Sequence, residues 1–201
     1  TPKPSSAASD VYKRQPSSVP LRIPGKKFGK PKALTPTEIK EIIKKFTFVA
    51  KVARESGFTG VQIHSAHGYL LSEFLSPDIN LRNDEWGGSI ENRTRIHVEI
   101  IKSIRQELGS DFPISVKMNS ADFQRGGLTP DEAVVAAKII ESAGVDNIEV
   151  SGGTYEQPKL LGLDKVSVQP KRSEIIKNST IAREAYFCLL YTSPSPRDLS
   201  T

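Results

Sequence analysis

Two histidines and a tyrosine that can act together in chemistry lie close to one another in the sequence, at His64, His67 and Tyr69. The spacing of the histidines allows both imidazoles to reach one small volume, where they can donate hydrogen bonds to one oxygen atom or bind a metal ion. The phenol of Tyr69 is a candidate proton donor to a carbanion-like centre. Two alternatives stay open at this point: a metal site, which lacks a third ligand at a recognisable spacing, and purely structural roles for these side chains.

Helices and strands that alternate along the chain would position these residues. The segment LTPTE at residues 34–38 recurs as LTPDE at residues 128–132. In each copy the threonine can cap the free amide groups of a helix, the proline fits the first helical position, and the glutamate completes a capping box. The sequence pattern predicts helices over residues 36–55, 92–108 and 130–142, strands over residues 60–64, 114–118 and 147–151, and a further helix that begins near Thr180.

Polar residues collect just beyond the predicted strand ends, in the segments HSAHGY (64–69), NSAD (119–122) and SGGT (151–154). Strands that alternate with helices of this length imply right-handed crossovers and a parallel sheet, and therefore an α/β fold. Ligands bind at the carboxyl ends of the strands in such folds. A complete barrel of eight units needs on the order of 250 residues, so three strands form either a small open sheet or part of a larger domain.

Three stretches of the sequence carry a family resemblance: GFTGVQIHSAHGYLLSEFLSPDINLRNDEWGGSIENR at residues 57–93, VKMNSADFQRGG at residues 116–127 and IEVSGGTYEQP at residues 148–158. They resemble the Old Yellow Enzyme family, the FMN-dependent NADH:flavin oxidoreductases and ene-reductases. The resemblance extends over almost all of residues 16–187. It implies a partial TIM (β/α)8 barrel, in which this chain supplies about three parallel strands with their helices, from around strands four to six.

The resemblance also implies a chemistry for the residues named above. In that family the histidine pair, here His64 and His67, holds the carbonyl oxygen of a small-molecule activated alkene and stabilises the negative charge that develops there. Bound FMN passes hydride from its N5 atom to the alkene, the residue at Tyr69 supplies the proton, and NAD(P)H reduces the flavin again. Lys117 would lie near the flavin N1 and O2 atoms. Many relatives have arginine at this position, so the ammonium group of lysine, a point charge, would replace a planar guanidinium group.

The two ends of the chain differ from its middle in composition. DVYKRQ at residues 10–15 and CLLYTS at residues 188–193 can be encoded by opposite strands of one DNA segment, which resembles the transposase adapter used in preparing sequencing libraries. We therefore expect an adapter-like, disordered tail at 1–15, the fragment of an FMN-binding TIM barrel at 16–187, and a second adapter-like tail at 188–201. The family's flavin site also needs residues from the first and last strands, so we predict that the chain as written neither binds FMN tightly nor turns over.

Composition excludes several classes of protein. The chain has 201 residues, 28 of them basic and 23 acidic, and because these charges are well mixed we expect no nucleic-acid partner. No apolar run approaches the roughly 18 residues of a membrane span, and the single cysteine, Cys188, excludes a disulfide framework. With no secretion signal in the sequence, we expect a cytoplasmic protein without a membrane partner. The alternative function is a small α/β binding module whose histidine pair holds a metal ion or an anion.

Overall fold

The computed structural model describes residues 14–22, 29–154 and 156–157 of the chain. Within this part of the chain, the elements follow one another in the order β1 (Arg14–Gln15), β2 (Lys32–Ala33), α2 (Pro36–Glu55), β3 (Val61–Ser65), α3 (Leu70–Leu75), α4 (Ile90–Leu108), β4 (Ile114–Asn119), α5 (Pro130–Ser142) and β5 (Asn147–Ser151). β3, β4 and β5 alternate with the long helices, which is the repeat of an α/β fold.

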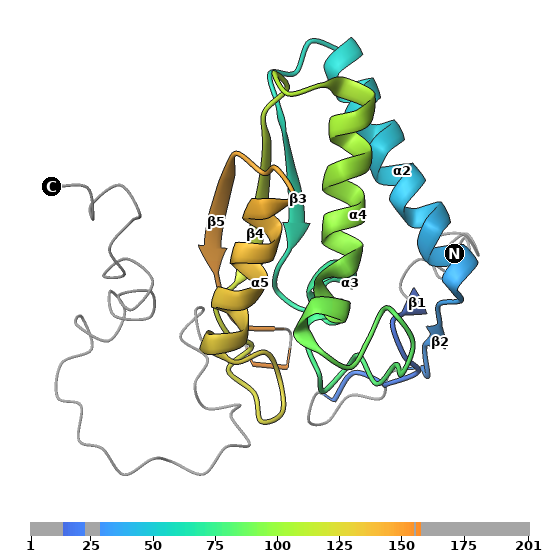
Figure 1. Ribbon diagram of the computed structural model, residues 1–201. Coiled ribbons are helices and arrows are strands. Elements are labelled where there is room, and N and C mark those ends of the chain that lie inside the picture. The colour runs from blue at the N-terminus through green and yellow to red at the C-terminus, as the bar shows by residue number, and fades with distance from the viewer. Residues whose placement is uncertain (1–13, 23–28, 155, 158–201) are drawn as a thin grey trace, which may run out of the picture.

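The strands β3, β4 and β5 form one parallel sheet in that order. In its register Ile63 pairs with Val116, and Val116 pairs with Ile148. The long helices α2, α4 and α5 lie along one side of the sheet (Figure 1), and no described helix lies on the other side. Neighbouring parallel strands with helices on one side form part of a TIM barrel, as predicted, and the uncovered face corresponds to the barrel interior.

The three helices and three strands predicted from the sequence pattern are confirmed, with bounds that differ by at most two residues. α3 and the β1–β2 pair were not predicted. β1 lies in the expected disordered tail, and this expectation is wrong for Arg14 and Gln15, which gain backbone partners: they pair with β2, and the amide of Leu34 donates to the carbonyl of Gln15 over 2.9 Å. The rest of that tail, the helix expected near Thr180 and the second tail lie outside the described residues.

Both capping boxes predicted from the repeated segment are present. The Thr35 hydroxyl oxygen accepts a hydrogen bond from the Glu38 amide over 3.2 Å, and the Glu38 carboxylate accepts one from the Thr35 amide over 2.8 Å. The start of α5 repeats this arrangement with Thr129 and Glu132. Each box satisfies amide groups that have no partner inside their own helix, and so fixes the residue at which the helix begins.

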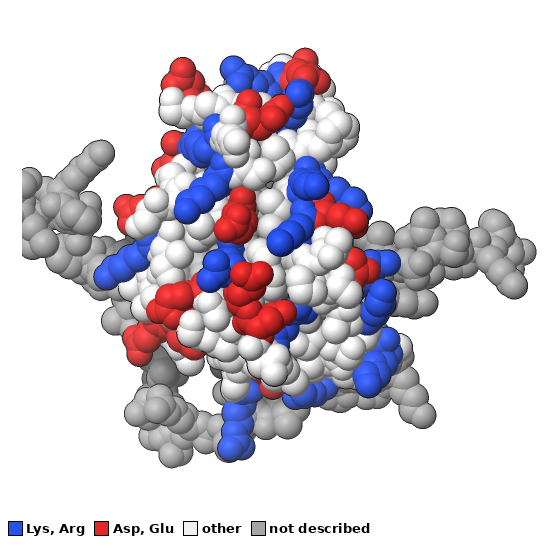
Figure 2. Space-filling model, turned by 45° about the vertical axis from the view of Figure 1, so that its right-hand side comes forward, with Lys and Arg blue, Asp and Glu red and all other residues white. Residues whose placement is uncertain are grey.

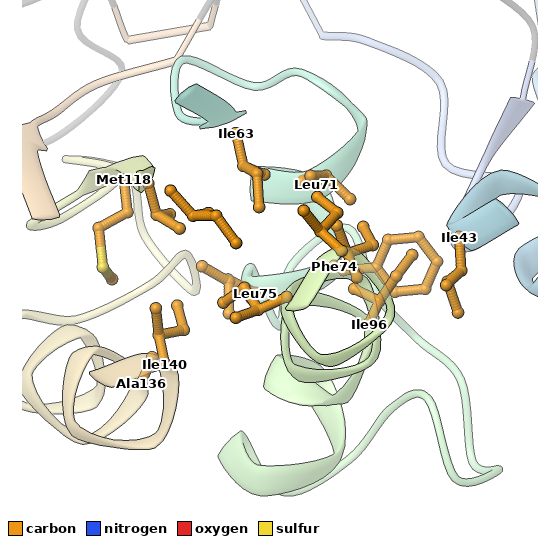
Figure 3. Close-up of a cluster of buried hydrophobic side chains, with 14 of the residues drawn as sticks. Ile43, Ile63, Leu71, Phe74, Leu75, Ile96, Met118, Ala136 and Ile140 are labelled. Carbon is orange, nitrogen blue, oxygen red and sulfur yellow. The ribbon is translucent and has the colours of Figure 1, made fainter. Parts of the chain in front are cut away.

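One hydrophobic core fills the space between the sheet and its helices. Ile63 on β3 and Val116 on β4 are buried in it, together with Ile96 on α4 (Figure 3). The short helix α3 adds Phe74 and Leu71, neither of which is exposed. Because successive side chains of a strand point to opposite faces, the residues next to Ile63 and Val116 in the sequence face the open side of the sheet.

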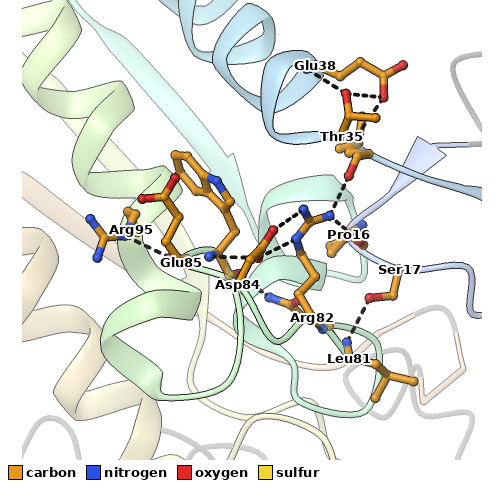
Figure 4. A network of polar contacts seen from close by, with 12 residues as sticks. Pro16, Ser17, Thr35, Glu38, Leu81, Arg82, Asp84, Glu85 and Arg95 are labelled. Carbon is orange, nitrogen blue, oxygen red and sulfur yellow. Dashed lines mark hydrogen bonds and ion pairs between the residues drawn. The ribbon is translucent and has the colours of Figure 1, made fainter.

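The connection between α3 and α4 has little regular structure and is held by Arg82. Its guanidinium donates hydrogen bonds to the carbonyl oxygens of Pro16, at 2.9 Å, and Leu34, at 2.5 Å, and forms an ion pair with Asp84 (Figure 4). The side-chain amide of Asn80 donates to two further carbonyl groups of the same region. The bonds of Arg82 fasten the connection to the N-terminal residues.

The surface carries charges of both signs. In the view of Figure 2, lysine and arginine side chains are interspersed with aspartate and glutamate over the visible face. This mixture agrees with the charge pattern expected from the sequence. Within the described residues, no helix is both long enough and apolar enough to cross a membrane.

Candidate functional site

The carboxyl ends of β3, β4 and β5 lie side by side and bring polar side chains together. His64 pairs in register with Lys117, and Lys117 pairs with Glu149, so these three side chains leave the sheet on the same face. Their sequence neighbours Ile63 and Val116 are buried against the helices. The three polar side chains therefore lie on the open face, which would line the interior of a barrel.

His64, His67 and Tyr69 form a ring cluster at this edge. The centre of the His64 ring lies 5.4 Å from that of His67 and 4.9 Å from that of Tyr69. Tyr69 stands at the N-terminal cap position of α3 and is 42% exposed. The structure therefore brings together the three residues singled out from the sequence, in a place that a ligand can reach.

The loop that follows β3 turns through an uncommon backbone conformation at His67, whose φ is 64°. The His67 amide donates to the Asn119 side-chain oxygen over 3.1 Å, and its ring Nε2 lies 2.6 Å from the Ser151 hydroxyl oxygen. Gly68 follows with a φ of 77°, which costs glycine little. A left-handed residue that carries a Cβ is uncommon, and such residues concentrate at functional sites.

Both histidines of the pair are neutral at neutral pH. Burial is the main reason that the pKa of His64 is lowered, and the positive charge of Lys117 lowers it further, against the effect of Glu149. Burial also lowers the pKa of His67, with added contributions from His64 and Lys117. A neutral imidazole has one N–H donor and one acceptor nitrogen. The pair can therefore offer two hydrogen bonds to one oxygen atom while carrying no charge of its own.

Lys117 lies beside the histidine pair and is held by a carboxylate that sequence reasoning missed. Its Nζ is 2.8 Å from Glu149 Oε1, and the side-chain amide of Gln62 donates to the other carboxylate oxygen over 2.8 Å. The hydrogen bond from Lys117 is the largest cause that lowers the pKa of Glu149. The two-residue alternation within the predicted strand at 147–151 was the signal that could have placed Glu149 on this face.

Asn119 and Asp122 connect the loops that follow the strands. Asn119 is fully buried at the end of β4, and its Nδ2 donates to Asp122 Oδ1 and to the Gly153 carbonyl oxygen, each over 2.9 Å. Asp122 also accepts a hydrogen bond from the Leu128 amide over 2.8 Å, and burial raises the pKa of its carboxyl group. Sequence reasoning placed both residues at a strand end but gave them no role, because their partners come from other loops.

The third histidine does not join the pair. His97 is fully buried on α4, where its Nε2 lies 2.6 Å from the Ser65 hydroxyl oxygen, and burial lowers its pKa to about 4. Across residues 14–22, 29–154 and 156–157, no three His, Cys, Asp or Glu side chains lie close enough to hold a metal ion. Among the described residues, the histidine pair therefore has no third metal ligand, and its polar neighbours are hydrogen-bonding groups and Lys117.

A parallel sheet with helices on one side, and with polar side chains at the carboxyl ends of its strands, defines the class of α/β barrel proteins that bind ligands at that edge. The sequence model of the NADH:flavin oxidoreductase / NADH oxidase family matches residues 2–179, and the chain belongs to this family. The resemblance stated from the sequence is thereby confirmed. Members of the family are oxidoreductases that use FMN and NAD(P)H.

Individual relatives support the same assignment. The chain is 44% identical over 147 residues to the NADH oxidase of Thermoanaerobacter brockii, which is 73% of this chain and 22% of that protein. An old yellow enzyme homologue from Zymomonas mobilis matches with a TM-score of 0.62 and 27% identity, over 78% of this chain and 48% of that one. A complex of 2-naphthoyl-CoA reductase with 2-naphthoyl-CoA gives a TM-score of 0.66 and 38% identity, over 70% and 21% respectively. The chain spans less than half the length of each relative, as a partial barrel would.

The residues present fit one edge of a flavin ring. Lys117 supplies a fixed positive charge on the open face of the sheet, within reach of Glu149, which orients it. The neutral imidazoles of His64 and His67 supply N–H donors at the same edge. This set of donors suits a ring system on which negative charge builds during reduction.

Proposed function

We propose that the chain is the central part of an FMN-dependent NAD(P)H oxidoreductase that reduces activated C=C bonds of small enone-type molecules. One observation carries the proposal: the rings of His64, His67 and Tyr69 gather at the carboxyl end of β3, with neighbouring centres 5.4 Å and 4.9 Å apart. Two hydrogen-bond donors and a proton donor in this arrangement suit a carbonyl compound that gains negative charge and then a proton.

His64 and His67 hold the carbonyl oxygen of the substrate. Both imidazoles are neutral because burial lowers the pKa of each, so they act as hydrogen-bond donors and keep their protons. Such donors accelerate a reaction when they point to an oxygen atom on which charge develops. FMN, when bound, would supply the hydride chemistry, and Lys117 would hold the flavin edge at which negative charge accumulates.

Tyr69 supplies the proton to the carbon α to the carbonyl group. Its ring lies against that of His64, and the residue is 42% exposed, which places Tyr69 beside a molecule held by the histidines. A phenol is a suitable donor here because it is a much stronger acid than the C–H bond that forms.

The activity is tested in the full-length protein, obtained by extending the coding sequence at both ends from the source DNA. We expect it to purify with FMN and to oxidise NAD(P)H in the presence of 2-cyclohexenone. His64→Ala and His67→Ala should each lower kcat/KM for the enone by about 10²-fold, with FMN stoichiometry as the control for folding. A full-length protein that binds FMN and oxidises NAD(P)H but leaves every enone untouched would contradict the proposed substrate class.

We also propose that residues 16–187 are native and that both tails derive from an adapter. The family model matches from residue 2 and so includes most of the first tail. The origin of the tails must therefore be tested on the source DNA. A long sequencing read of untagmented source DNA across both junctions should show the frame continuing into further strand–helix units. A start codon and a stop codon at the present ends would make the adapter origin wrong. A cytoplasmic location stays a prediction.

The alternative function has less support. A small binding module that holds a metal ion with the histidine pair would need a further ligand, and the described residues contain no group of three suitable side chains. An anion held by the pair would meet two imidazoles whose pKa values are lowered and which therefore carry no charge at neutral pH.

A further inference from the structure

Side chains of the two neighbouring strands hold His67 at both its backbone and its ring. The His67 amide donates to Asn119, and its ring Nε2 lies 2.6 Å from the Ser151 hydroxyl oxygen. The ring of His64 contacts His67 and Tyr69, and within the described residues it has no hydrogen-bond partner. The two imidazoles of the pair are therefore unequal. Residues of β4 and β5 fix the position of His67, and the ring of His64 can adjust its orientation.

The orientation of the Asn119 amide is determined by its partners. Its Oδ1 accepts from the His67 amide over 3.1 Å, while its Nδ2 donates to Asp122 Oδ1 and to the Gly153 carbonyl oxygen over 2.9 Å each. A flipped amide would place Nδ2 against an N–H group and the oxygen against two acceptors, so only one orientation satisfies all three contacts. Because Asn119 is fully buried, no solvent competes for these bonds.

Asn119 therefore joins the loops that follow all three strands. Asp122, its partner after β4, is fixed in turn by the Leu128 amide at 2.8 Å. Gly153, its partner after β5, donates its own amide to the Ala121 carbonyl over 3.0 Å. The contact to His67 after β3 holds that residue at a φ of 64°, which is unfavourable for a residue with a Cβ unless the surroundings impose it.

The hydrogen bond between Ser151 and His67 has a preferred direction. Ser151 is 8% exposed, and the ring of His67 is its one side-chain partner among the described residues. If Nε2–H donated to the hydroxyl oxygen, the buried O–H group would have no acceptor, which is costly. If the hydroxyl donates to Nε2, its proton is satisfied, and the neutral imidazole carries its own proton on Nδ1.

We propose that Asn119 and Ser151 are positioning residues for His67: Asn119 fixes its backbone, and Ser151 donates to Nε2 and so directs the Nδ1–H group toward the ligand oxygen. The proposal rests on the proposed function for the identity of that ligand, a carbonyl group. The fixed imidazole sets the position of the oxygen atom, and His64 adjusts to complete the second hydrogen bond.

The test uses the 201-residue chain without flavin or substrate, so its outcome is independent of the enone activity. All samples carry Phe48→Lys and Val49→Lys, which remove exposed apolar surface from α2 and so limit association between chains. Histidine is labelled with ¹⁵N, and long-range ¹H–¹⁵N spectra report which ring nitrogen of His67 carries the proton. The signals of the three histidines are assigned with single His→Gln variants. We expect two well-separated ¹⁵N signals for His67 in the wild-type chain, with the protonated signal at Nδ1.

Ser151→Ala should move these two signals toward each other, because both tautomers become populated, and should leave the His97 signals in place. Ser151→Thr keeps the hydroxyl and should restore the wild-type separation. Gln62→Ala is the control. The Gln62 side chain lies on the same face of the sheet and contacts Glu149, so its removal should leave the ring signals of His67 unchanged. A proton on Nε2 in the wild-type chain, or an unchanged His67 in Ser151→Ala, would overturn the role of Ser151.

Asn119 is tested through the His67 amide. Asn119→Ala should increase the hydrogen-exchange rate of that amide, with the methyl spectrum of the core as the control for folding. If this variant does not fold, the same bond is tested in the wild-type chain by a scalar coupling across it, between the His67 amide nitrogen and the Asn119 side-chain carbonyl carbon. Unchanged exchange in a folded variant, or no coupling in the wild type, would show that Asn119 does not hold His67.

Discussion

Tyr69 is the residue whose substitution separates the two halves of the proposed reaction. Its ring centre lies 4.9 Å from that of His64, and Tyr69→Phe keeps this ring while removing the phenolic proton. In the full-length enzyme we expect alkene reduction to slow by about 10²-fold or more, because general acid catalysis is lost. Reduction of the flavin by NAD(P)H should stay nearly unchanged. Stopped-flow absorbance of the flavin measures both half-reactions, and an equal loss in both would mean that Tyr69 shapes the pocket instead of donating a proton.

Glu73 is a second residue whose environment leads to a measurable effect, this time on stability. It lines a cavity of about 20 Å³, which is room for about one water molecule. Burial raises the pKa of its carboxyl group to about 8, against a hydrogen bond from Gln15 that lowers it. The folded protein therefore retains this proton over a pH range in which the unfolded chain has released it.

The sign of the effect follows from proton linkage. A raised pKa in the folded state gives stability that is complete below pH 4.5 and is lost as the pH rises to about 8, by at most about 5 kcal/mol. Glu73→Gln should flatten this pH dependence and make the variant more stable than the wild type near pH 9. Urea unfolding at pH 5, 7 and 9 measures it, with the exposed Glu141→Gln on α5 as the matched control. Parallel pH profiles for Glu73→Gln and the wild type would show that Glu73 is ionised in the fold.

At the scale of elements, the two capping boxes offer a matched pair of substitutions. Glu132 caps α5 and also forms an ion pair with Arg93, whose side chain is 4% exposed and further donates to carbonyl oxygens of Leu75 and Gly88. Glu38 caps α2, and its ionic partners Arg14 and Lys32 are exposed. The two glutamates therefore share one local role and differ in their tertiary contacts.

Glutamine preserves a capping box, so the substitution isolates the ion pair. We expect Glu132→Gln to lower the free energy of unfolding by about 2 kcal/mol, because it leaves the buried Arg93 charge without its counter-ion. Glu38→Gln should have a smaller effect, since exposed ion pairs contribute little. Urea denaturation of the two variants measures the difference. Equal losses would mean that the Arg93 guanidinium is satisfied by the carbonyl oxygens alone.

The predicted elements are those with strong local signals. Thr35 and Thr129 mark helix starts because the capping residues lie within a few positions in the sequence, and the apolar pattern of α4 fixes its buried face. α3 is only 6 residues long, too short for a helical period to appear. β1 and β2 are 2 residues each and exist through pairing with each other, which no local pattern encodes.

The features of the candidate site likewise divide into those that local sequence signals predict and those that depend on contacts between strands. His64, His67, Tyr69 and Lys117 could be predicted because the strand ends and the family resemblance both point to them. The contacts of Asn119 with His67 and of Glu149 with Lys117 join residues on different strands. Such contacts depend on the register of the sheet and on one backbone conformation at His67, and neither is readable from spacing alone.

At the scale of the whole molecule, the described part of the chain leaves surfaces that a complete barrel would cover. β3 and β5 are the outer strands of the sheet, and each pairs on one side only with a described strand. On α2, Phe48 and Val49 are 65% and 63% exposed. Unpaired strand edges and exposed apolar side chains both favour association between chains. The polar inner face, with Lys117 and the histidine pair, is open as well.

We therefore expect the 201-residue chain alone to self-associate and to purify with far less than one equivalent of FMN, whereas the full-length protein binds FMN stoichiometrically. Size-exclusion chromatography with light scattering gives the mass, and flavin absorbance after denaturation gives the FMN content. Phe48→Lys combined with Val49→Lys should reduce the association of the isolated chain, because it removes apolar surface from α2, without restoring FMN binding. A monomeric 201-residue chain with one tightly bound FMN would contradict the partial barrel, because three strands would then suffice for the flavin site.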